Sequence, residues 1–196
     1  MEQIETGCGW YTDDKIYKDY HDQEWAVPEW DSRALWEKLI LDGFQAGLSW
    51  ITILKKRDAF REAFAGFDPN LVAKFTQDDV ERLLQNAGII RHRGKIEAAI
   101  SNAKVWQDIE AEQGFDTYLW NFTGGAPLQP NYEKRADIPT HTDLSTQISK
   151  DLKKRGFKFC GPTIVYAFME AVGMVNDHVT SCPRHKEVQA LANRRE

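Results

Sequence analysis

The chain has 196 residues, of which 42% are hydrophobic and 28% are charged, which predicts one globular domain with a buried core and excludes a disordered chain. Its longest apolar runs, such as 164–169, are far shorter than the ~20 residues that span a bilayer, which excludes a membrane protein. The acidic segment Met1–Glu5 lacks the features of a signal peptide, and three cysteines give no disulfide framework, so we expect a cytoplasmic protein.

The 25 basic residues are outnumbered by 30 acidic ones, and the net charge of −5 argues mildly against nucleic acid as a partner. Ten of the basic residues nevertheless gather in three windows, 55–57, 91–95 and 153–158. Such windows suit local contacts with a phosphate backbone, and solvated helix ends account for them equally well.

Apolar residues recur every three to four positions along most of the chain, which is typical of amphipathic helices. In chain order, the first predicted helices are one capped by Asp31 or Ser32, one over 49–65, a short one from Pro69 to Phe75, and one behind a Thr76–Asp79 capping box that ends before Gly88. A long helix from about Ile96 to Gly114, a short helix capped by Asp116 and a final pair within about 143–173 follow, with a connecting loop over 124–139. No stretch alternates as a strand does, so we predict an all-α protein with a central bundle over about 31–122.

Aromatic residues are concentrated near the N-terminus. Five of the seven tryptophans and three of the six tyrosines lie in the first 50 residues, namely Trp10, Trp25, Trp30, Trp36 and Trp50, and Tyr11, Tyr17 and Tyr20. Their flat, electron-rich faces are suited to stacking a base or holding a cation. A tryptophan-rich part of the core explains the same cluster.

Two Cys/His pairs lie near the two ends of the chain: Cys8 with His21, and His178 with Cys182. The spacing of His178 and Cys182 would place both on one face of a helical turn, and the two pairs together would complete a closed, structural Cys₂His₂ zinc site. Buried thiols and hydrogen-bonded imidazoles are the simpler interpretation of either pair alone. Cys160 has no such partner and is predicted to be a small core residue.

The segment 153–164 combines a helix that ends in basic residues, a short stretch bounded by Gly156 and Gly161, and a new helix that starts at Pro162. Glycines let the backbone approach a ligand closely, and the amides at a helix start point outward. This pattern predicts a helix–hairpin–helix that binds a DNA phosphate, and a simple turn between two helices fits it as well.

Six motifs in this order connect these features: 8–10, 20–28, 45–52, 87–96, 154–159 and 175–178. With them the chain resembles the bacterial 3-methyladenine DNA glycosylase I family, of the helix–hairpin–helix DNA glycosylase superfamily. The resemblance implies a single compact helical domain over 1–196, whose N- and C-terminal segments are joined at one structural Zn²⁺. It also implies a monofunctional DNA repair hydrolase that removes 3-methyladenine from alkylated double-stranded DNA and leaves an abasic site. By its substrate the protein would be associated with the nucleoid, and no obligatory protein partner is evident.

The resemblance carries the following roles onto this sequence. Zinc ligands fall on Cys8, His21, His178 and Cys182; base-binding residues on Trp10, Tyr17, Tyr20, Trp25 and Trp50; and DNA-binding residues on Gln45, Gly47 and Leu48 in one turn and on Gly156, Lys158, Gly161 and Thr163 in the hairpin. The catalytic pocket carboxylate, a glutamate in the family, falls on Asp42, and Asn176 stands where the wider superfamily has its catalytic aspartate.

Asp42 is the main departure from the family pattern. We expect its carboxylate to be ionised, to lie opposite Trp50 and to be aimed inward by a turn at Gly43; an exposed aspartate at a helix end is the alternative. Leu48 is expected to fill the gap left by a flipped base, unless it is a core residue. Because aspartate is one methylene shorter than glutamate, a catalytically weak or inactive damaged-DNA-binding module is the alternative function.

Overall fold

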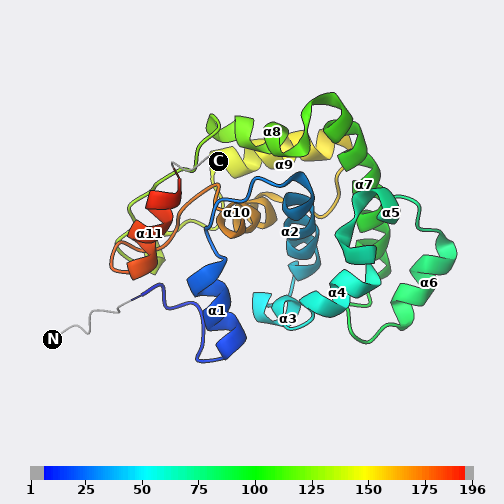
Figure 1. Ribbon diagram of the computed structural model, residues 1–196, viewed down its shortest axis with the longest axis horizontal. Coiled ribbons are helices and arrows are strands. Elements are labelled where there is room, and N and C mark those ends of the chain that lie inside the picture. The colour runs from blue at the N-terminus through cyan, green and yellow to red at the C-terminus, as the bar shows by residue number, and fades with distance from the viewer. Residues whose placement is uncertain (1–6, 193–196) are drawn as a thin grey trace.

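The computed structural model describes residues 7–192 of the chain (Figure 1). Its α-helices are α1 (Lys15–Gln23), α2 (Ser32–Gln45), α3 (Trp50–Leu54), α4 (Arg57–Ala63), α5 (Pro69–Val72), α6 (Gln77–Gln85), α7 (Arg93–Gln113), α8 (Phe115–Trp120), α9 (Asp143–Arg155), α10 (Pro162–Ala171) and α11 (Pro183–Leu191). Three short 3₁₀ helices are η1 (Ala65–Phe67), η2 (Asn121–Thr123) and η3 (Arg135–Asp137). The prediction of an all-α protein is confirmed. Within residues 7–192 the structure contains no strand, and its β-pairing is limited to an isolated bridge between Leu128 and Val175.

Several helix ends form as the sequence predicts. The side chain of Asp31 caps α2 by accepting from the Ala34 amide at 2.8 Å. Thr76 and Asp79 form the expected capping box of α6. Gly156 ends α9 with a φ of 106°, a conformation that favours glycine.

Two predicted elements are wrong in detail. The helix expected over 49–65 is broken into α3 and α4 at Lys55–Lys56, where Lys56 Nζ donates to the carbonyl of Ala87 at 2.9 Å and ties the break to the loop before α7. Asp116 does not cap α8 but lies in its first turn. Glu110 takes the capping role there, because its carboxylate accepts from the Phe115 amide at 2.7 Å.

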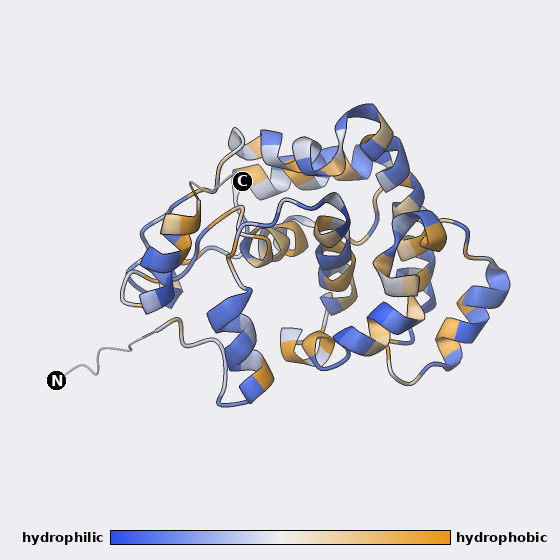
Figure 2. Ribbon diagram, viewed as in Figure 1, coloured by the Kyte–Doolittle hydropathy of each residue, from blue (hydrophilic) through white to orange (hydrophobic). Residues whose placement is uncertain are grey.

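Two helices, α1 and α11, were not predicted. Figure 2 shows α1 as largely hydrophilic. Its apolar and aromatic positions, Ile16, Tyr17 and Tyr20, have helical spacing, but nine residues contain too few of them for a clear sequence signal. None of the helices within residues 7–192 has the length and apolar character needed to cross a membrane. The segment Met1–Glu5, on which the expectation of no signal peptide was based, lies outside the described residues.

The main core surrounds α2, which packs against α7, α8 and α10, while α9 packs on α10 (Figure 1). Cys160 is buried in this core, as predicted. A second, smaller core joins the two ends of the chain near α1 and α11 and contains Cys8, Tyr20, Trp25, Ala26, Leu54, Val179, Cys182 and Val188.

The segment after α1 crosses the end of α10 at very close range. The amide of Ala26 donates to the carbonyl of Glu170 at 3.0 Å. A Cβ atom at Gly173, whose φ is 69°, would lie 2.5 Å from the backbone of Val27 and Pro28, so this crossing requires glycine. As a result, the C-terminal end of α10 lies directly beside Trp25.

Candidate active site

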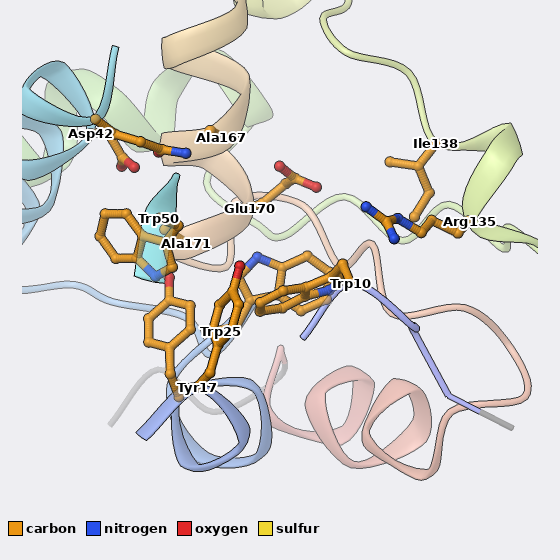
Figure 3. A pocket seen from close by; sticks show the side chains of 12 residues that line it. Trp10, Tyr17, Trp25, Asp42, Trp50, Arg135, Ile138, Ala167, Glu170 and Ala171 are labelled. Atoms are coloured by element: carbon orange, nitrogen blue, oxygen red, sulfur yellow. The ribbon is translucent and has the colours of Figure 1, made fainter. Parts of the chain in front are cut away.

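A cavity of about 350 Å³ lies between the two cores, large enough for a small planar ligand. Its lining comes from segments that are far apart in the sequence: Trp10, Tyr17, Tyr20, Trp25, Asp42, Gln45, Trp50, Arg135, Ile138, Ala167, Glu170 and Ala171 (Figure 3). All five aromatic residues singled out as base-binding candidates are among them.

Aromatic rings form one wall of this cavity. The ring centroid of Trp10 lies 5.1 Å from that of Tyr17 and 5.0 Å from that of Trp25, and the rings of Tyr20 and Trp50 are 5.4 Å apart. The indole nitrogens of Trp10 and Trp50 are buried and have no hydrogen-bond partner among the described residues. The wall therefore combines electron-rich faces with two N–H donors that a bound ligand can use.

The other two N-terminal tryptophans belong to the core. Trp36 is fully buried beside Phe67, and Trp30 stacks on Trp120 with a centroid distance of 3.8 Å. Each interpretation of the aromatic cluster therefore applies to part of it. Trp30 and Trp36 form part of the core, whereas Trp10, Trp25 and Trp50 line the cavity.

Asp42 lies in the last turn of α2 and is only 2% exposed, so the alternative of an exposed aspartate is wrong. Its Oδ2 atom has no hydrogen-bond partner among residues 7–192. Burial raises the pKa of this carboxyl well above its usual range, and the charge of Lys38 opposes the shift. In the ligand-free protein burial therefore favours the neutral acid rather than the expected carboxylate.

The turn expected at Gly43 is also wrong, because Gly43 is part of α2. The missing side chain instead makes room for the hairpin. A Cβ atom at Gly43 would lie 3.3 Å from the carbonyl oxygen of Phe159, so the hairpin packs tightly against the end of α2.

Glu170 and Arg135 also line the cavity, and sequence analysis missed both. Glu170 ends the apolar run of α10, where a charged residue resembles an ordinary solvated helix end. Arg135 lies in η3, and its Nη1 donates to the carbonyl of Gly9 at 3.0 Å. Neither position carries a local sequence signal, since each reaches the cavity only through the fold.

The four candidate metal ligands are buried, and their ligand atoms all lie within 4.8 Å of one another. His178 Nδ1 is 3.4 Å from Cys8 Sγ and 3.6 Å from Cys182 Sγ, and His21 Nε2 is 3.8 Å from Cys182 Sγ. Tetrahedral bonds of ~2.3 Å to sulfur and ~2.05 Å to nitrogen correspond to S···N separations of about 3.6 Å. Donor set and spacing therefore fit one four-coordinate metal ion.

The second nitrogen of each imidazole has its own partner outside this group. His178 Nε2 lies 3.2 Å from the carbonyl oxygen of Trp25, and His21 Nδ1 lies 2.7 Å from Asp22 Oδ1. Such contacts orient ligand histidines and select the tautomer that leaves the other nitrogen free for a metal. The expected helical turn between His178 and Cys182 is wrong, because a loop joins them and Cys182 is the N-cap of α11.

The turn over 45–49 links α2 to α3 at the edge of the cavity. Gln45 lines the cavity, Gly47 has a φ of 81°, and Leu48 is 42% exposed, which excludes a core role for Leu48. Lys95, itself 7% exposed, holds the turn: its Nζ donates to the carbonyls of Phe44 and Ala46 at 2.9 and 2.6 Å.

The hairpin between α9 and α10 is fixed from behind by Asn102, whose side chain bonds both the amide and the carbonyl of Lys158, at 2.9 and 3.0 Å. The side chains of Lys158 and Thr163 are exposed, and Gly161 is the N-cap of α10. Through Phe159 and Gly43 the hairpin meets the same end of α2 as the 45–49 turn. Cavity, turn and hairpin are therefore neighbours.

Comparison with known proteins gives one consistent result. The family model described as methyladenine glycosylase matches residues 10–185. The chain is 52% identical over 176 residues to "DNA-3-methyladenine glycosylase 1" of Escherichia coli (strain K12), covering 89% of this chain and 94% of that protein. It is 48% identical to "DNA-3-methyladenine glycosylase" of Haemophilus influenzae, covering 91% of this chain and 97% of that protein.

Solved structures agree with these matches. A crystal structure of 3-methyladenine DNA glycosylase I superposes with a TM-score of 0.89 at 53% identity, covering 90% of this chain and 98% of the other. A variant of such an enzyme in complex with 3-methyladenine superposes with a TM-score of 0.86 at 43% identity, covering 88% and 93%.

Proposed function

Because the chain belongs to the methyladenine glycosylase family, we propose that it hydrolyses the N-glycosidic bond of 3-methyladenine in alkylated double-stranded DNA and leaves an abasic site. The observation that carries this proposal is the cavity itself, in which five aromatic side chains face two carboxyl groups. In a bacterial cell the substrate would be nucleoid DNA.

The aromatic wall suits the charge of the damaged base. Methylation at N3 makes the adenine ring cationic and therefore a good leaving group. Each well-placed indole or phenol ring attracts such a cation by roughly 0.5–2 kcal/mol, depending on desolvation. The proposed base-binding residues are therefore Trp10, Tyr17, Tyr20, Trp25 and Trp50. Neutral adenine gains no comparable attraction from these rings.

Asp42 is the proposed catalytic carboxyl. A cation that enters the cavity lowers the cost of ionising this buried group, so the charged base and the carboxylate stabilise one another. Its shorter side chain brings the carboxyl less far into the cavity than glutamate would. None of the described residues that line the cavity is a lysine, which supports hydrolysis without a Schiff-base step.

The DNA contacts are proposed to come from two neighbouring segments. Gln45, Gly47 and the exposed Leu48 would occupy the space left by the flipped base, as apolar side chains do between unstacked base steps. At the start of α10, a backbone phosphate would be held by Gly156, Lys158, Gly161 and Thr163. Both segments abut the end of α2 that carries Asp42.

We propose that Cys8, His21, His178 and Cys182 hold one structural zinc ion per chain. Four protein ligands leave no coordination position for water or substrate, so a zinc ion there would supply structure and no reaction step. Its effect on the cavity would pass through Trp25, whose ring centroid is 4.6 Å from that of His178.

A base-release assay tests the function. Alkylated duplex DNA is incubated with the protein, and free 3-methyladenine, 3-methylguanine and 7-methylguanine are quantified against unmodified DNA. Release of 3-methyladenine supports the proposal. Tight binding to alkylated DNA without release would instead support the alternative of a damaged-DNA-binding module in which Asp42 has cost the activity.

A further inference from the structure

Arg135 is the one basic residue among the described residues that line the cavity, and the proposed function does not use it. It lies in η3 and its side chain is exposed, whereas Asp42 is only 2% exposed. Figure 3 shows Arg135 across the cavity from Asp42, with the side chain of Glu170 between them. Arg135 therefore lies at the rim of the cavity that faces solvent, and Asp42 lies at its buried end.

The guanidinium of Arg135 has one hydrogen bond and several unused donors. Its Nη1 donates to the carbonyl of Gly9 at 3.0 Å. Its charge reaches the phenol of Tyr17, where it opposes the rise in pKa that burial causes. Within residues 7–192 the guanidinium forms no other hydrogen bond and no ion pair with a carboxylate. Four of its five N–H groups therefore remain available to a ligand.

An unpaired positive charge conflicts with a cavity proposed to receive a cationic base, because like charges repel. A negatively charged partner for Arg135 would remove this conflict. A flipped base enters a pocket while still attached to its sugar, so the two phosphates that flank this nucleotide stay outside, at the rim. The substrate therefore brings an anion to the place where the guanidinium lies.

We propose that Arg135 binds a backbone phosphate next to the flipped nucleotide. The planar guanidinium offers paired N–H groups that match the oxygens of a phosphate. The 45–49 turn and the hairpin both abut the end of α2 that carries Asp42, so this contact would hold the DNA from the other side of the cavity. The inference rests on the proposed glycosylase function and deepens it, because it makes the cavity selective for a base that is still part of DNA.

The alternative is a purely structural role, in which Arg135 holds the carbonyl of Gly9 and thereby keeps Trp10 in the aromatic wall. The two roles differ in the ligand that they affect. Free 3-methyladenine is a base without a phosphate, whereas a duplex with an abasic site has the phosphates without the base. Loss of a phosphate contact weakens binding of the duplex alone, and displacement of Trp10 weakens binding of the free base.

Two substitutions at Arg135 separate these roles. Arg135→Gln removes the charge and keeps an N–H donor, and Arg135→Lys keeps the charge. In Arg135→Gln we expect the Kd for the abasic-site duplex to rise about tenfold at low salt. The slope of log Kd against log salt concentration should fall by about one, the value for one phosphate contact. The Kd for free 3-methyladenine should stay within about twofold of the parent.

The matched control is Lys74→Gln, which removes one positive charge from an exposed position just after α5, on the side of the molecule away from α1 and α11 (Figure 1). This control and Arg135→Lys should both keep the salt dependence of the parent. An unchanged slope in Arg135→Gln, an equal loss of slope in Arg135→Lys, or an equal loss of affinity for free base and duplex overturns the inference while the function stands. A parent protein that releases no 3-methyladenine from alkylated DNA overturns the proposed function and this inference with it.

Discussion

Replacing Asp42 by asparagine should stabilise the protein and impair its activity at the same time. The substitution keeps the shape of the side chain and removes a carboxyl that is 2% exposed and has one oxygen without a partner in the described residues. Such opposite effects are expected where a buried group is kept for function rather than for folding.

The gain in stability depends on pH. Because the folded-state pKa of Asp42 is raised above its ordinary 3.8, the folded protein keeps a proton that the unfolded chain releases, and stability falls as pH rises above 3.8. Above pH 3.8, each pH unit lowers the free energy of unfolding by about 1.4 kcal/mol for as long as the folded carboxyl stays protonated. At pH 7 this destabilisation has an upper limit of about 4 kcal/mol. The charge of Lys38 reduces it. We expect Asp42→Asn to raise the free energy of unfolding at pH 7, and the advantage to vanish near pH 4.

The loss of activity follows from the charge. A hydrogen bond to an ionised group contributes about 1.5–3 kcal/mol, which corresponds to a roughly 10- to 150-fold fall in kcat/KM for 3-methyladenine release in Asp42→Asn. Asp42→Glu, which restores the longer reach of the family's glutamate, should be tolerated and raise activity. Urea denaturation at pH 4 and pH 7, with base release at pH 7, measures both effects. Parent-like excision by Asp42→Asn would show that the carboxylate is not used.

Three further substitutions test the remaining parts of the site. Cys182→Ser should abolish stoichiometric zinc in elemental analysis and lower stability by about 3 kcal/mol; a metal-free parent protein, or an unchanged melting temperature, contradicts the zinc site. Leu48→Ala should weaken binding to a duplex with an abasic site by about 1.5 kcal/mol, or tenfold. The melting temperature should stay within a degree or two, because Leu48 is 42% exposed. A large loss of stability would refute the proposal that Leu48 fills the space left by the flipped base. Lys95→Met leaves the carbonyls of Phe44 and Ala46 without their donor. Hydrogen exchange of the backbone amides over 46–49 should therefore accelerate, and binding to an abasic-site duplex should weaken. Unchanged exchange would mean that Lys95 does not hold the turn.

Most helices can be predicted from the sequence because the apolar periodicity that marks them lies within the helix itself. The prediction fails where contacts with residues far away in the sequence determine where a helix begins or ends. The apolar face over 49–65 is continuous, yet the helix breaks where Lys56 reaches the carbonyl of Ala87. α1 is only nine residues long and mostly polar, so its few helically spaced apolar and aromatic positions are a weak signal in the sequence, and contacts with the second core stabilise it.

The same distinction applies to the site. Cysteines, histidines and clustered tryptophans are rare enough to be noticed in a sequence, and the structure brings the ligand pairs and the five candidate aromatic residues together. Lys95 and Glu170 are ordinary residue types in ordinary places. Lys95 belongs to a basic window that resembles a solvated surface, and its burial depends on carbonyls about 50 residues away in the sequence. No local pattern reveals such contacts.

The cavity is shared by the two ends of the chain, and this has a consequence for protein synthesis. The ribosome makes Cys8, Trp10 and Trp25 more than a hundred residues before Glu170, His178 and Cys182. A chain that ends before residue 170 contains all five aromatic residues of the wall, but it lacks the end of α10 and the metal-ligand candidates His178 and Cys182. During synthesis the early aromatic residues therefore have no complete cavity to line until the segment that carries Glu170, His178 and Cys182 has also been made.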